Sequence, residues 1–241
     1  MSHRRARCDS GRVSTPVLVI TGTDTEVGKT VAAAVIAAAL AARGQRVLAI
    51  KLAQTGVGEN EDGDAQTIAR LAGVEVDEHL RLPDPLAPDV AAELAETSIP
   101  TVGEHAERVA EQAQSDRYDV ILVEGSGGLL VRLDSEGATL ADLGIPLEAK
   151  GIRTGYVVVV RPGLGTLNHT ALTLEALRNR GLDLVGVVIG SASDQPDLAE
   201  RTNVDRLRTL AEGQLLGAVP SGAGDLPPQT FREQAPTWIR L

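Results

Sequence analysis

A glycine-bounded segment between an apolar run and an alanine-rich stretch constrains the fold of this chain more than any other feature. The apolar run at residues 17–21 is typical of a fully buried strand, and residues 29–43 have a high helix propensity. Between them stands Gly22-Thr-Asp-Thr-Glu-Val-Gly28-Lys29-Thr30, a variant phosphate-binding loop with five residues, instead of four, before the Gly-Lys pair. A glycine turn without a ligand is the alternative, but Gly-Lys-Thr in this context argues against it. The segment therefore predicts a P-loop that binds a nucleoside triphosphate.

The chemistry expected of this loop follows from the start of its helix. Backbone N–H groups at a helix N-terminus point toward a bound anion, and the helix dipole favours negative charge there. Lys29 is predicted to neutralise the β- and γ-phosphates, and the Thr30 hydroxyl is predicted to coordinate Mg²⁺. ATP or another nucleoside triphosphate, with Mg²⁺, is the expected co-substrate.

The rest of the chain alternates apolar runs with helical patterns. Further strands are expected at 47–50, 120–123, 157–160, 184–189 and 215–219, and helices at 64–72, 104–115, 168–180 and 198–211. Such alternation predicts an α/β fold with a doubly wound, mostly parallel sheet flanked by helices, as in P-loop NTPases. In that fold, ligands bind at the carboxyl ends of the strands, and polar residues follow the predicted strands repeatedly.

We expect residues 15–241 to form one P-loop domain and residues 1–14 to be a disordered N-terminal extension. The segment at 83–100 carries prolines at 83, 85, 88 and 100 and is the least regular part of the chain. A linker between domains is one interpretation. A loop that crosses the active-site face is the preferred one, because nothing after it looks like a separate fold.

Composition excludes several classes of function. Aromatic residues make up only 2% of the chain, and the formal net charge is −10, so neither base stacking nor a basic face for nucleic acid is expected. Cys8 is the only cysteine, which rules out an intrachain disulfide and a cysteine-based zinc site. No apolar run approaches the ~20 residues of a membrane span. A cytoplasmic location without membrane partners is the simplest expectation.

Two carboxylates and a lysine stand where the predicted topology would bring them to the nucleotide. Glu124 ends a strand before Gly125-Ser-Gly, whose small residues let the backbone approach a ligand closely. Asp64 begins a helix, where a capping role is the alternative to Mg²⁺ binding. Lys51 ends the second strand and is either solvated or placed to stabilise charge during phosphoryl transfer.

A second helix start follows the predicted strand at 157–160. Gly163-Leu-Gly-Thr-Leu-Asn168-His169 offers free N–H groups suited to a carboxylate or a phosphate. A glycine turn with an asparagine cap explains the same residues, so the pattern leaves both readings open.

Several motifs, in order, resemble those of the dethiobiotin synthetase family. They are GTDTEVGKT, the Lys51-x-x-x-Thr-Gly segment, Asp64, LAPDVAAE, VEGSGGLLV and LGTLNHTALTLEAL, and the correspondence runs in order from about residue 17 to residue 220. The resemblance implies a homodimeric ligase that uses 7,8-diaminononanoate, CO2 and a Mg-nucleoside triphosphate. In that family the N7 amine takes up CO2, the carbamate attacks the γ-phosphate, and the second amine closes the ureido ring.

The resemblance also implies roles for individual residues. The catalytic residues would be Lys29 and Lys51, and the Mg²⁺ ligands would be Thr30, Asp64 and Glu124. The substrate-binding residues would be Thr25, Thr55, Gly165, Thr166, Leu167 and Asn168, the last four reaching the substrate across the dimer. The nucleotide-binding residues would be Glu26, Val27, Gly28, Lys29, Thr30, Asp64, Glu124, Gly125, Ser126, Gly127, Gly190, Ser191, Pro220, Ser221 and Gly222.

The chain departs from the family pattern at two positions in the folded part. Lys51-Leu-Ala53 stands where Lys-Pro-Val is common, on the segment that carries Thr55. Gly190-Ser191 stands where many members place an asparagine that reads adenine.

Two other classes of protein are alternatives, and the first of them shares the variant P-loop. Partitioning and cell-division ATPases carry a second lysine where this chain has Asp24, and they commonly end in a membrane-targeting helix, whereas this tail reads as broken by prolines. Cobyrinate-type amide-forming enzymes need a cysteine nucleophile for a glutaminase, and Cys8 lies in the expected extension.

Overall fold

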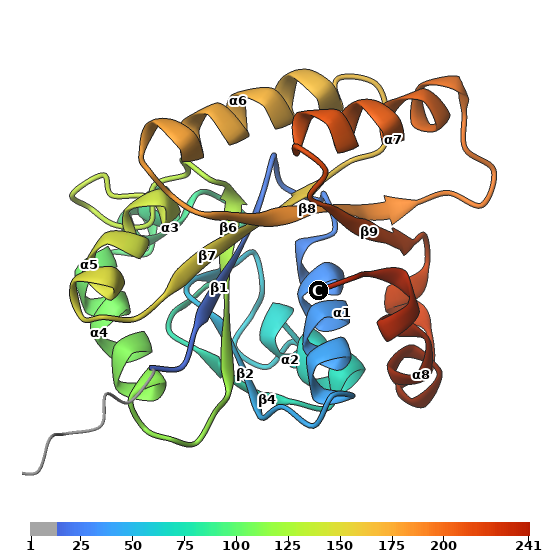
Figure 1. Ribbon diagram of the computed structural model, residues 1–241. Helices are drawn as coiled ribbons and strands as arrows, with labels where there is room; N and C mark the ends of the chain where they lie inside the picture. Colours follow the sequence, from blue (N-terminus) through green and yellow to red (C-terminus); the bar gives the residue numbers. More distant parts are fainter. Residues whose placement is uncertain (1–13) are drawn as a thin grey trace, which may run out of the picture.

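A seven-stranded parallel sheet organises the computed structural model, which describes residues 14–241 (Figure 1). Its strand order is β4-β2-β6-β1-β7-β8-β9, and every pairing is parallel. The strands are β1 (Val17–Gly22), β2 (Val47–Lys51), β4 (Glu75–Glu78), β6 (Val120–Gly128), β7 (Thr154–Val160), β8 (Leu184–Ala192) and β9 (Leu215–Pro220). The chain builds one side of β1 first and then crosses to the other side, which confirms the predicted doubly wound α/β fold.

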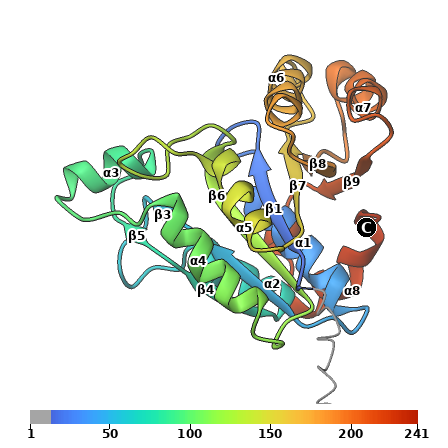
Figure 2. The same ribbon diagram turned by 60° about the vertical axis from the view of Figure 1, so that its left-hand side comes forward.

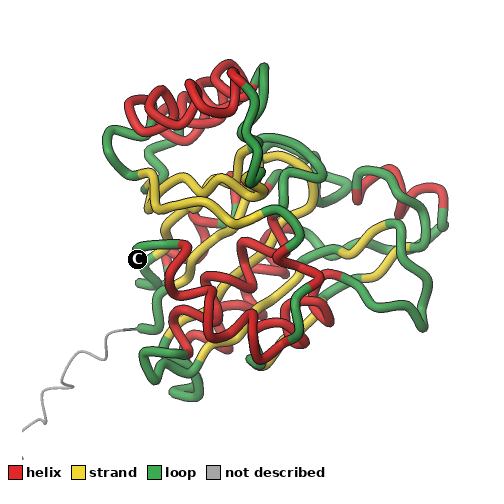
Figure 3. The backbone as a smooth tube through the Cα atoms, turned by 90° about the vertical axis from the view of Figure 1, so that its right-hand side faces the viewer, coloured by secondary structure: helices red, strands yellow, loops and turns green. Residues whose placement is uncertain are grey.

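Helices cover both faces of this sheet. One face carries α1 (Lys29–Ala41), α2 (Asp64–Ala72) and α8 (Pro228–Trp238), and the other carries α4 (Val102–Ala113), α5 (Gly144–Ala149), α6 (Thr166–Asn179) and α7 (Leu198–Leu210). Figure 2 and Figure 3 show the strands lying between these two helical layers.

Consecutive residues of the central strands face opposite helical layers. Val19 and Val158 belong to the core beneath α4, α6 and α7, whereas Ile20 and Val157 belong to the core shared with α1, α2 and α8. Both cores exclude water, so these strands read as continuous apolar runs, and this is why the sequence predicts them well. Helix α1 is buried nearly all round, because it packs against the sheet, α2 and α8.

The element ends differ from the prediction where small or polar residues continue a strand. Strand β6 runs on through Gly125-Ser-Gly-Gly, and β8 runs on through Gly190 to Ala192. Helix α4 begins before the predicted start, because Thr101 and Glu104 form a reciprocal capping box. Helix α2 has the predicted bounds.

Several short elements have no apolar pattern and were not predicted. They are edge strand β4, the small parallel pair β3 (Gln54–Thr55) and β5 (Arg81–Leu82), helix α5, and the 3₁₀ turns at Leu140–Asp142 and Ala223–Asp225. The β3–β5 pair and helix α3 (Pro88–Leu94) project from one end of the main sheet (Figure 2).

Two predictions about proline-rich segments are wrong in part. The segment at 83–100 is not all loop, because Pro88 occupies the first position of α3, where its missing N–H needs no partner. The tail is likewise helical rather than broken, since α8 starts at Pro228 and reaches Trp238 despite Pro236. Phe231 and Ala235 of α8 are fully buried, so this helix belongs to the core.

The predicted extension, with Cys8, lies outside the described residues except for Ser14, whose hydroxyl donates to the carbonyl of Gly151 at 2.7 Å. Within residues 14–241 no helix is long and apolar enough to cross a membrane.

Strand β8 passes directly against the P-loop. A Cβ atom on Gly190 would lie 1.9 Å from the carbonyl oxygen of Val27, and one on Gly28 would lie 2.5 Å from that of Gly190. Gly28 also has a φ of 89°, which favours glycine. The two glycines therefore set how closely the loop and the sheet approach.

We expect Gly190→Ala to destabilise the fold by about 1–3 kcal/mol, the usual cost of an over-packed site, and to weaken nucleotide binding by shifting the loop. Urea unfolding and ATP titration measure the two effects. Gly103→Ala is the matched control, because its Cβ would meet only the Thr101 hydroxyl, at 3.7 Å. A Gly190→Ala protein with unchanged stability and ATP affinity would contradict the close approach.

A buried histidine pair joins the end of β4 to α4. The Nδ1 atoms of His79 and His105 lie 2.8 Å apart, and their rings stack with centroids 5.1 Å apart. Burial, followed by the nearby charge of Arg108, lowers the pKa of His79 to about 3 and that of His105 to about 4. Both rings are therefore neutral in the folded protein at neutral pH.

The pair makes stability depend on pH. The unfolded chain binds more protons below about pH 6.5, so stability is complete above that pH and falls as the pH drops toward 4. From pH 7.5 to 5 we expect the pair to account for a loss of about 4 kcal/mol in the free energy of unfolding. Urea unfolding of the wild type and of His79→Gln/His105→Gln at both values measures it. Between pH 7.5 and 5 the double variant should lose less free energy of unfolding than the wild type. The control His169→Gln, at an exposed position, should lose as much as the wild type. Equal losses in all three proteins would refute the assignment.

Candidate active site

Three charged side chains meet beside the P-loop. Lys51 Nζ lies 2.6 Å from Asp64 Oδ2 and 3.0 Å from Glu124 Oε1, and it also donates to the carbonyl of Gly125 at 3.0 Å. The Thr30 hydroxyl donates to the same oxygen, Glu124 Oε1, at 3.0 Å. Two strands and two helix starts thus deliver one polar cluster to the predicted edge of the sheet.

The register of the sheet explains why Lys51 and Glu124 meet. Strands β2 and β6 are parallel neighbours, and Lys51 is the register partner of Glu124 at their carboxyl ends. Asp64 enters from the first residue of α2. Lys51 and Glu124 are 3% and 2% exposed, so their charges are shielded from water and depend on one another.

The pKa values follow from burial opposed by pairing. Burial alone would lower the pKa of Lys51, but the carboxylates of Glu124 and Asp64 outweigh it and raise that pKa. Burial opposes ionisation of Asp64 too, yet Lys51 holds its pKa below the usual value. Burial raises the pKa of Glu124 despite Lys51. The cluster therefore holds a lysine that stays charged at neutral pH.

Lys29 and the start of the loop form the second part of the site. Lys29 Nζ donates to the carbonyl of Asp24 at 2.9 Å, and burial, then the charge of Lys51, lowers the pKa of Lys29. Asp24 also pairs at 2.5 Å with Arg161, the residue that directly follows β7, and accepts from the N–H of Thr25 at 2.8 Å. The loop is thereby tied to the strand that follows β1 in the sheet.

The residues present fit a bound Mg²⁺. Glu124 Oε2 is buried and has no hydrogen-bond partner, which is costly unless a cation or another ligand satisfies it. Thr30 and Asp64 add further oxygen donors, the type that Mg²⁺ prefers. Among the described residues no group of three or more His, Cys, Asp or Glu side chains could hold a metal alone. A site with few protein ligands suits Mg²⁺, which keeps water and phosphate oxygens in its shell.

A cleft of about 840 Å³ opens over this cluster. It is lined by these residues from the predicted site: Thr25, Glu26, Gly28, Lys29, Thr30, Lys51, Thr55, Asp64, Glu124, Ser126 and Gly127. Val27 is buried beneath the loop. Sequence reasoning missed these lining residues: Val31, Gln54, Pro85, Leu86, Ala87, Pro88 and Val131. The prolines were detectable, because their segment was expected to cross this face.

A smaller cleft of about 510 Å³ lies at the carboxyl ends of β8 and β9. Its lining includes predicted Pro220, Ser221 and Gly222, with Ser193 and Asp194, which were not predicted. Predicted Gly190 and Ser191 do not line it: Gly190 is buried against the P-loop, and Ser191 is exposed.

The predicted substrate residues 165–168 lie away from both clefts in this chain. Gly165, with a φ of 92°, precedes α6, and Asn168 is exposed. Thr166 is buried, and its hydroxyl has no hydrogen-bond partner. The described chain alone therefore does not bring this segment to Lys51.

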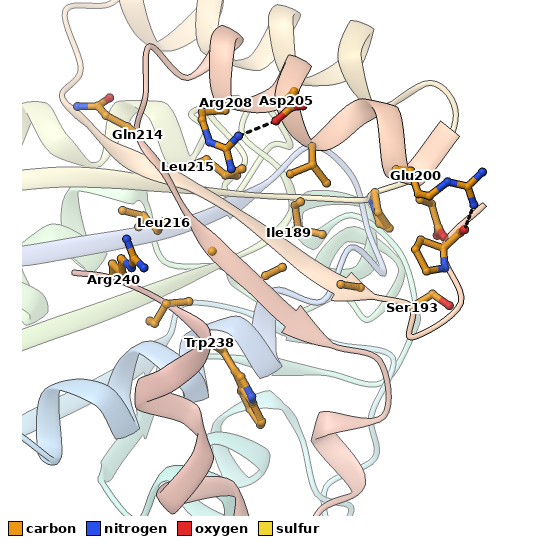
Figure 4. Close-up of a pocket in the computed structure, with 18 of the residues that line it drawn as sticks. Ile189, Ser193, Glu200, Asp205, Arg208, Gln214, Leu215, Leu216, Trp238 and Arg240 are labelled. Carbon is orange, nitrogen blue, oxygen red and sulfur yellow. Dashed lines mark hydrogen bonds and ion pairs between the residues drawn. The ribbon is translucent and has the colours of Figure 1, made fainter. Parts of the chain in front are cut away.

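A third groove, about 1020 Å³ and thus more voluminous than these two clefts, lies between α7, β9 and the C-terminal segment (Figure 4). Acidic and basic side chains alternate along it, and Asp205 pairs with Arg208 at 2.6 Å. No predicted site residue lines this groove, and Lys29 and Lys51 are therefore not among its lining residues. Size therefore does not identify the reacting site here; the converging charges do.

Solved structures share this fold at low sequence identity. The MinC:MinD cell division protein complex of Aquifex aeolicus matches with a TM-score of 0.55 and 17% identity over 94% of this chain and 98% of that one. Chloroplast FtsY from Physcomitrella patens also gives a TM-score of 0.55, at 19% identity over 93% of this chain and 66% of that one. These likenesses establish the P-loop NTPase fold only.

Sequence comparison is more specific. The family described as an AAA domain matches residues 17–224. The ATP-dependent dethiobiotin synthetase BioD of Streptomyces coelicolor is 53% identical over 93% of this chain and 92% of that protein. The protein of the same name from Corynebacterium efficiens is 40% identical over 93% and 98%. With similarity of this extent spanning the P-loop and the Lys51 cluster, the chain belongs to the ATP-dependent dethiobiotin synthetases, a family of ligases in biotin biosynthesis.

Proposed function

We propose that this protein makes dethiobiotin from 7,8-diaminononanoate, CO2 and ATP, with Mg²⁺ held by Thr30, Asp64 and Glu124. The observation that carries the proposal is the buried Lys51, held 2.6 Å from Asp64 and 3.0 Å from Glu124 at the floor of the P-loop cleft. A lysine in that position faces the space that a γ-phosphate would occupy.

The proposed reaction joins two amines through one carbon. The N7 amine adds to CO2 and loses a proton, which gives a carbamate. A carbamate oxygen attacks the γ-phosphorus and ADP leaves, which gives a carbamic–phosphoric anhydride. The second amine then attacks the carbamate carbon, phosphate leaves with the electron pair of the broken C–O bond, and a proton is released as the ureido ring closes.

In this scheme the ammonium groups of Lys29 and Lys51 offset the negative charge of the carbamate and the γ-phosphate. A carbamate anion and a triphosphate repel one another, and two fixed ammonium groups lower that repulsion as the oxygen approaches phosphorus. Mg²⁺ bound at the carboxylates would neutralise further phosphate charge. Thr25 and Thr55 are proposed to hold the diamine, so that the ring closure is effectively intramolecular.

The nucleotide is proposed to follow the P-loop and then turn toward β9. Glu26, Val27, Gly28, Lys29 and Thr30 would hold its phosphates, together with Gly125, Ser126 and Gly127. Its base would lie near Gly190, Ser191, Pro220, Ser221 and Gly222. The cleft at the ends of β8 and β9 supports this course, although Gly190 offers no side-chain amide to read the base.

A homodimer is proposed to complete the substrate site, in the cytoplasm, where ATP is available. Gly165, Thr166, Leu167 and Asn168 would enter the partner's cleft and bind the tail carboxylate of the substrate at the α6 N-terminus. Leu164 and Leu172 support an interface there, because they are 95% and 58% exposed beside and on α6.

Phosphate release tests the proposed reaction directly. With MgATP we expect release to require both diaminononanoate and bicarbonate, because the attacking oxygen belongs to the carbamate. Repeating the assay with CTP and GTP ranks the bases. Release that ignores the diamine would reject the ligase and favour a nucleotide-switched ATPase of the partitioning type.

Lys51→Ala tests the proposed catalytic lysine. We expect kcat to fall by at least ~100-fold, as for other groups that stabilise transition-state charge, while MgATP affinity stays largely unchanged. The control is Lys150→Ala, which removes a surface lysine paired with Glu107. Near-normal turnover in Lys51→Ala would reject the role.

A further inference from the structure

Arg81 uses its whole guanidinium group to fix the segment that precedes Asp64. Its Nε and Nη2 donate to the Glu78 carboxylate at 2.6 and 2.9 Å, and its Nη1 donates to the carbonyls of Gly58 and Glu61 at 2.8 and 2.6 Å. Nη2 also donates to Gln66 Oε1 at 3.1 Å. All five N–H donors of the side chain are thereby used.

These bonds converge on the turn at the start of α2. Gln66 Oε1 also accepts from the N–H of Gly63 at 3.0 Å, and Gln54 Oε1 accepts from the N–H of Asp64 at 2.7 Å. Gln54 and Arg81 are register partners in the small β3–β5 sheet. A Cβ on Gly63 would lie 2.7 Å from Gln54 Oε1 and 3.0 Å from Arg81 Nη2. The two side chains therefore enclose the turn.

The enclosed turn leads straight to the reacting cluster. Asp64 follows Gly63, and its carboxylate lies 2.6 Å from Lys51 Nζ. Gln54 comes from the segment just after Lys51, and its own N–H donates to the carbonyl of Leu80 at 2.8 Å. The Asp64 and Lys51 segments are thus held in one frame by Arg81 and Gln54.

We infer that Arg81 is a positioning residue, which sets the Asp64 carboxylate for cation binding through the turn at residues 58–63. The inference rests on the proposed function of Asp64 as a Mg²⁺ ligand. Arg81 itself does not line the cleft, so it acts only through the turn.

Charge alone cannot replace this side chain. A lysine ammonium is a single point of donation, whereas the guanidinium spans Glu78, the two carbonyls and Gln66 at once. Arg81→Lys keeps the positive charge but releases most of the turn. Partners that orient a metal ligand typically alter metal affinity by 10–100-fold, so we expect Arg81→Lys to raise the Mg²⁺ concentration that half-saturates ATP binding about tenfold.

The experiment measures ATP binding against Mg²⁺, without diaminononanoate, so it does not depend on turnover. Arg117→Lys is the matched control. Arg117 pairs with Glu75, which lies on β4 like Glu78, the partner of Arg81, but the Arg117–Glu75 pair is exposed on the surface. Thermal unfolding of each variant reports any general loss of stability. The inference requires a Mg²⁺ shift in Arg81→Lys and none in Arg117→Lys.

A double-mutant cycle separates positioning from folding. If Arg81 acts through Asp64, Arg81→Lys should shift the Mg²⁺ dependence little once Asp64→Asn is present. A lower Tm with unchanged Mg²⁺ dependence would overturn the inference, as would equal Mg²⁺ shifts in both backgrounds. A wild type that binds MgATP but needs no diamine to release phosphate would reject the proposed reaction while leaving the Arg81 result intact.

Discussion

The buried Lys51 ammonium, shared between Asp64 and Glu124, is the interaction on which the site depends. Burying any one of these charges without a partner would be strongly unfavourable. The three side chains can therefore be charged in the folded protein only if they lie next to one another. The fold meets this requirement by pairing β2 with β6 in a register that sets Lys51 opposite Glu124. Asp64 does not belong to the sheet, so the sheet register does not position it. The start of α2 therefore needs separate contacts to hold Asp64 beside Lys51.

The P-loop lies at the same edge of the sheet as Lys51, but it is held there by close backbone packing. Its backbone lies against Gly190 of β8, where no side chain fits, and Asp24 ties its start to Arg161. Lys29, the first residue of α1, therefore follows a loop that is fixed by its contacts with Gly190 of β8 and with Arg161 after β7. Two lysines thus converge from independent parts of the fold, each fixed by contacts that the other does not share.

Short-range patterns predicted the strands that are buried on both sides and the longer helices. The inner strands and α1 were predicted because most of their residues are apolar and contact a core. Strand β4 consists of charged residues and one valine, so it has no apolar pattern that would predict a strand. Helices α3 and α8 begin at prolines, which local patterns associate with loops. Lys51 and Glu124 could be placed because strand ends converge. Gln54 and Arg81 could not, since their role depends on hydrogen bonds between segments distant in sequence.

The two carboxylates of the cluster differ in burial and in their hydrogen-bond partners. Glu124 is buried and already binds Thr30 and Lys51 through Oε1, which leaves Oε2 as the unsatisfied atom. The Asp64 side chain is 32% exposed, and its side-chain partners are Lys51 and Thr30. Removing Glu124 would leave the buried Lys51 with only the partly exposed Asp64 as a partner, whereas displacing Asp64 leaves the buried Glu124 charge beside Lys51. Effects on cation binding that leave the fold intact therefore arise more readily at the Asp64 side, which is the side that Arg81 holds.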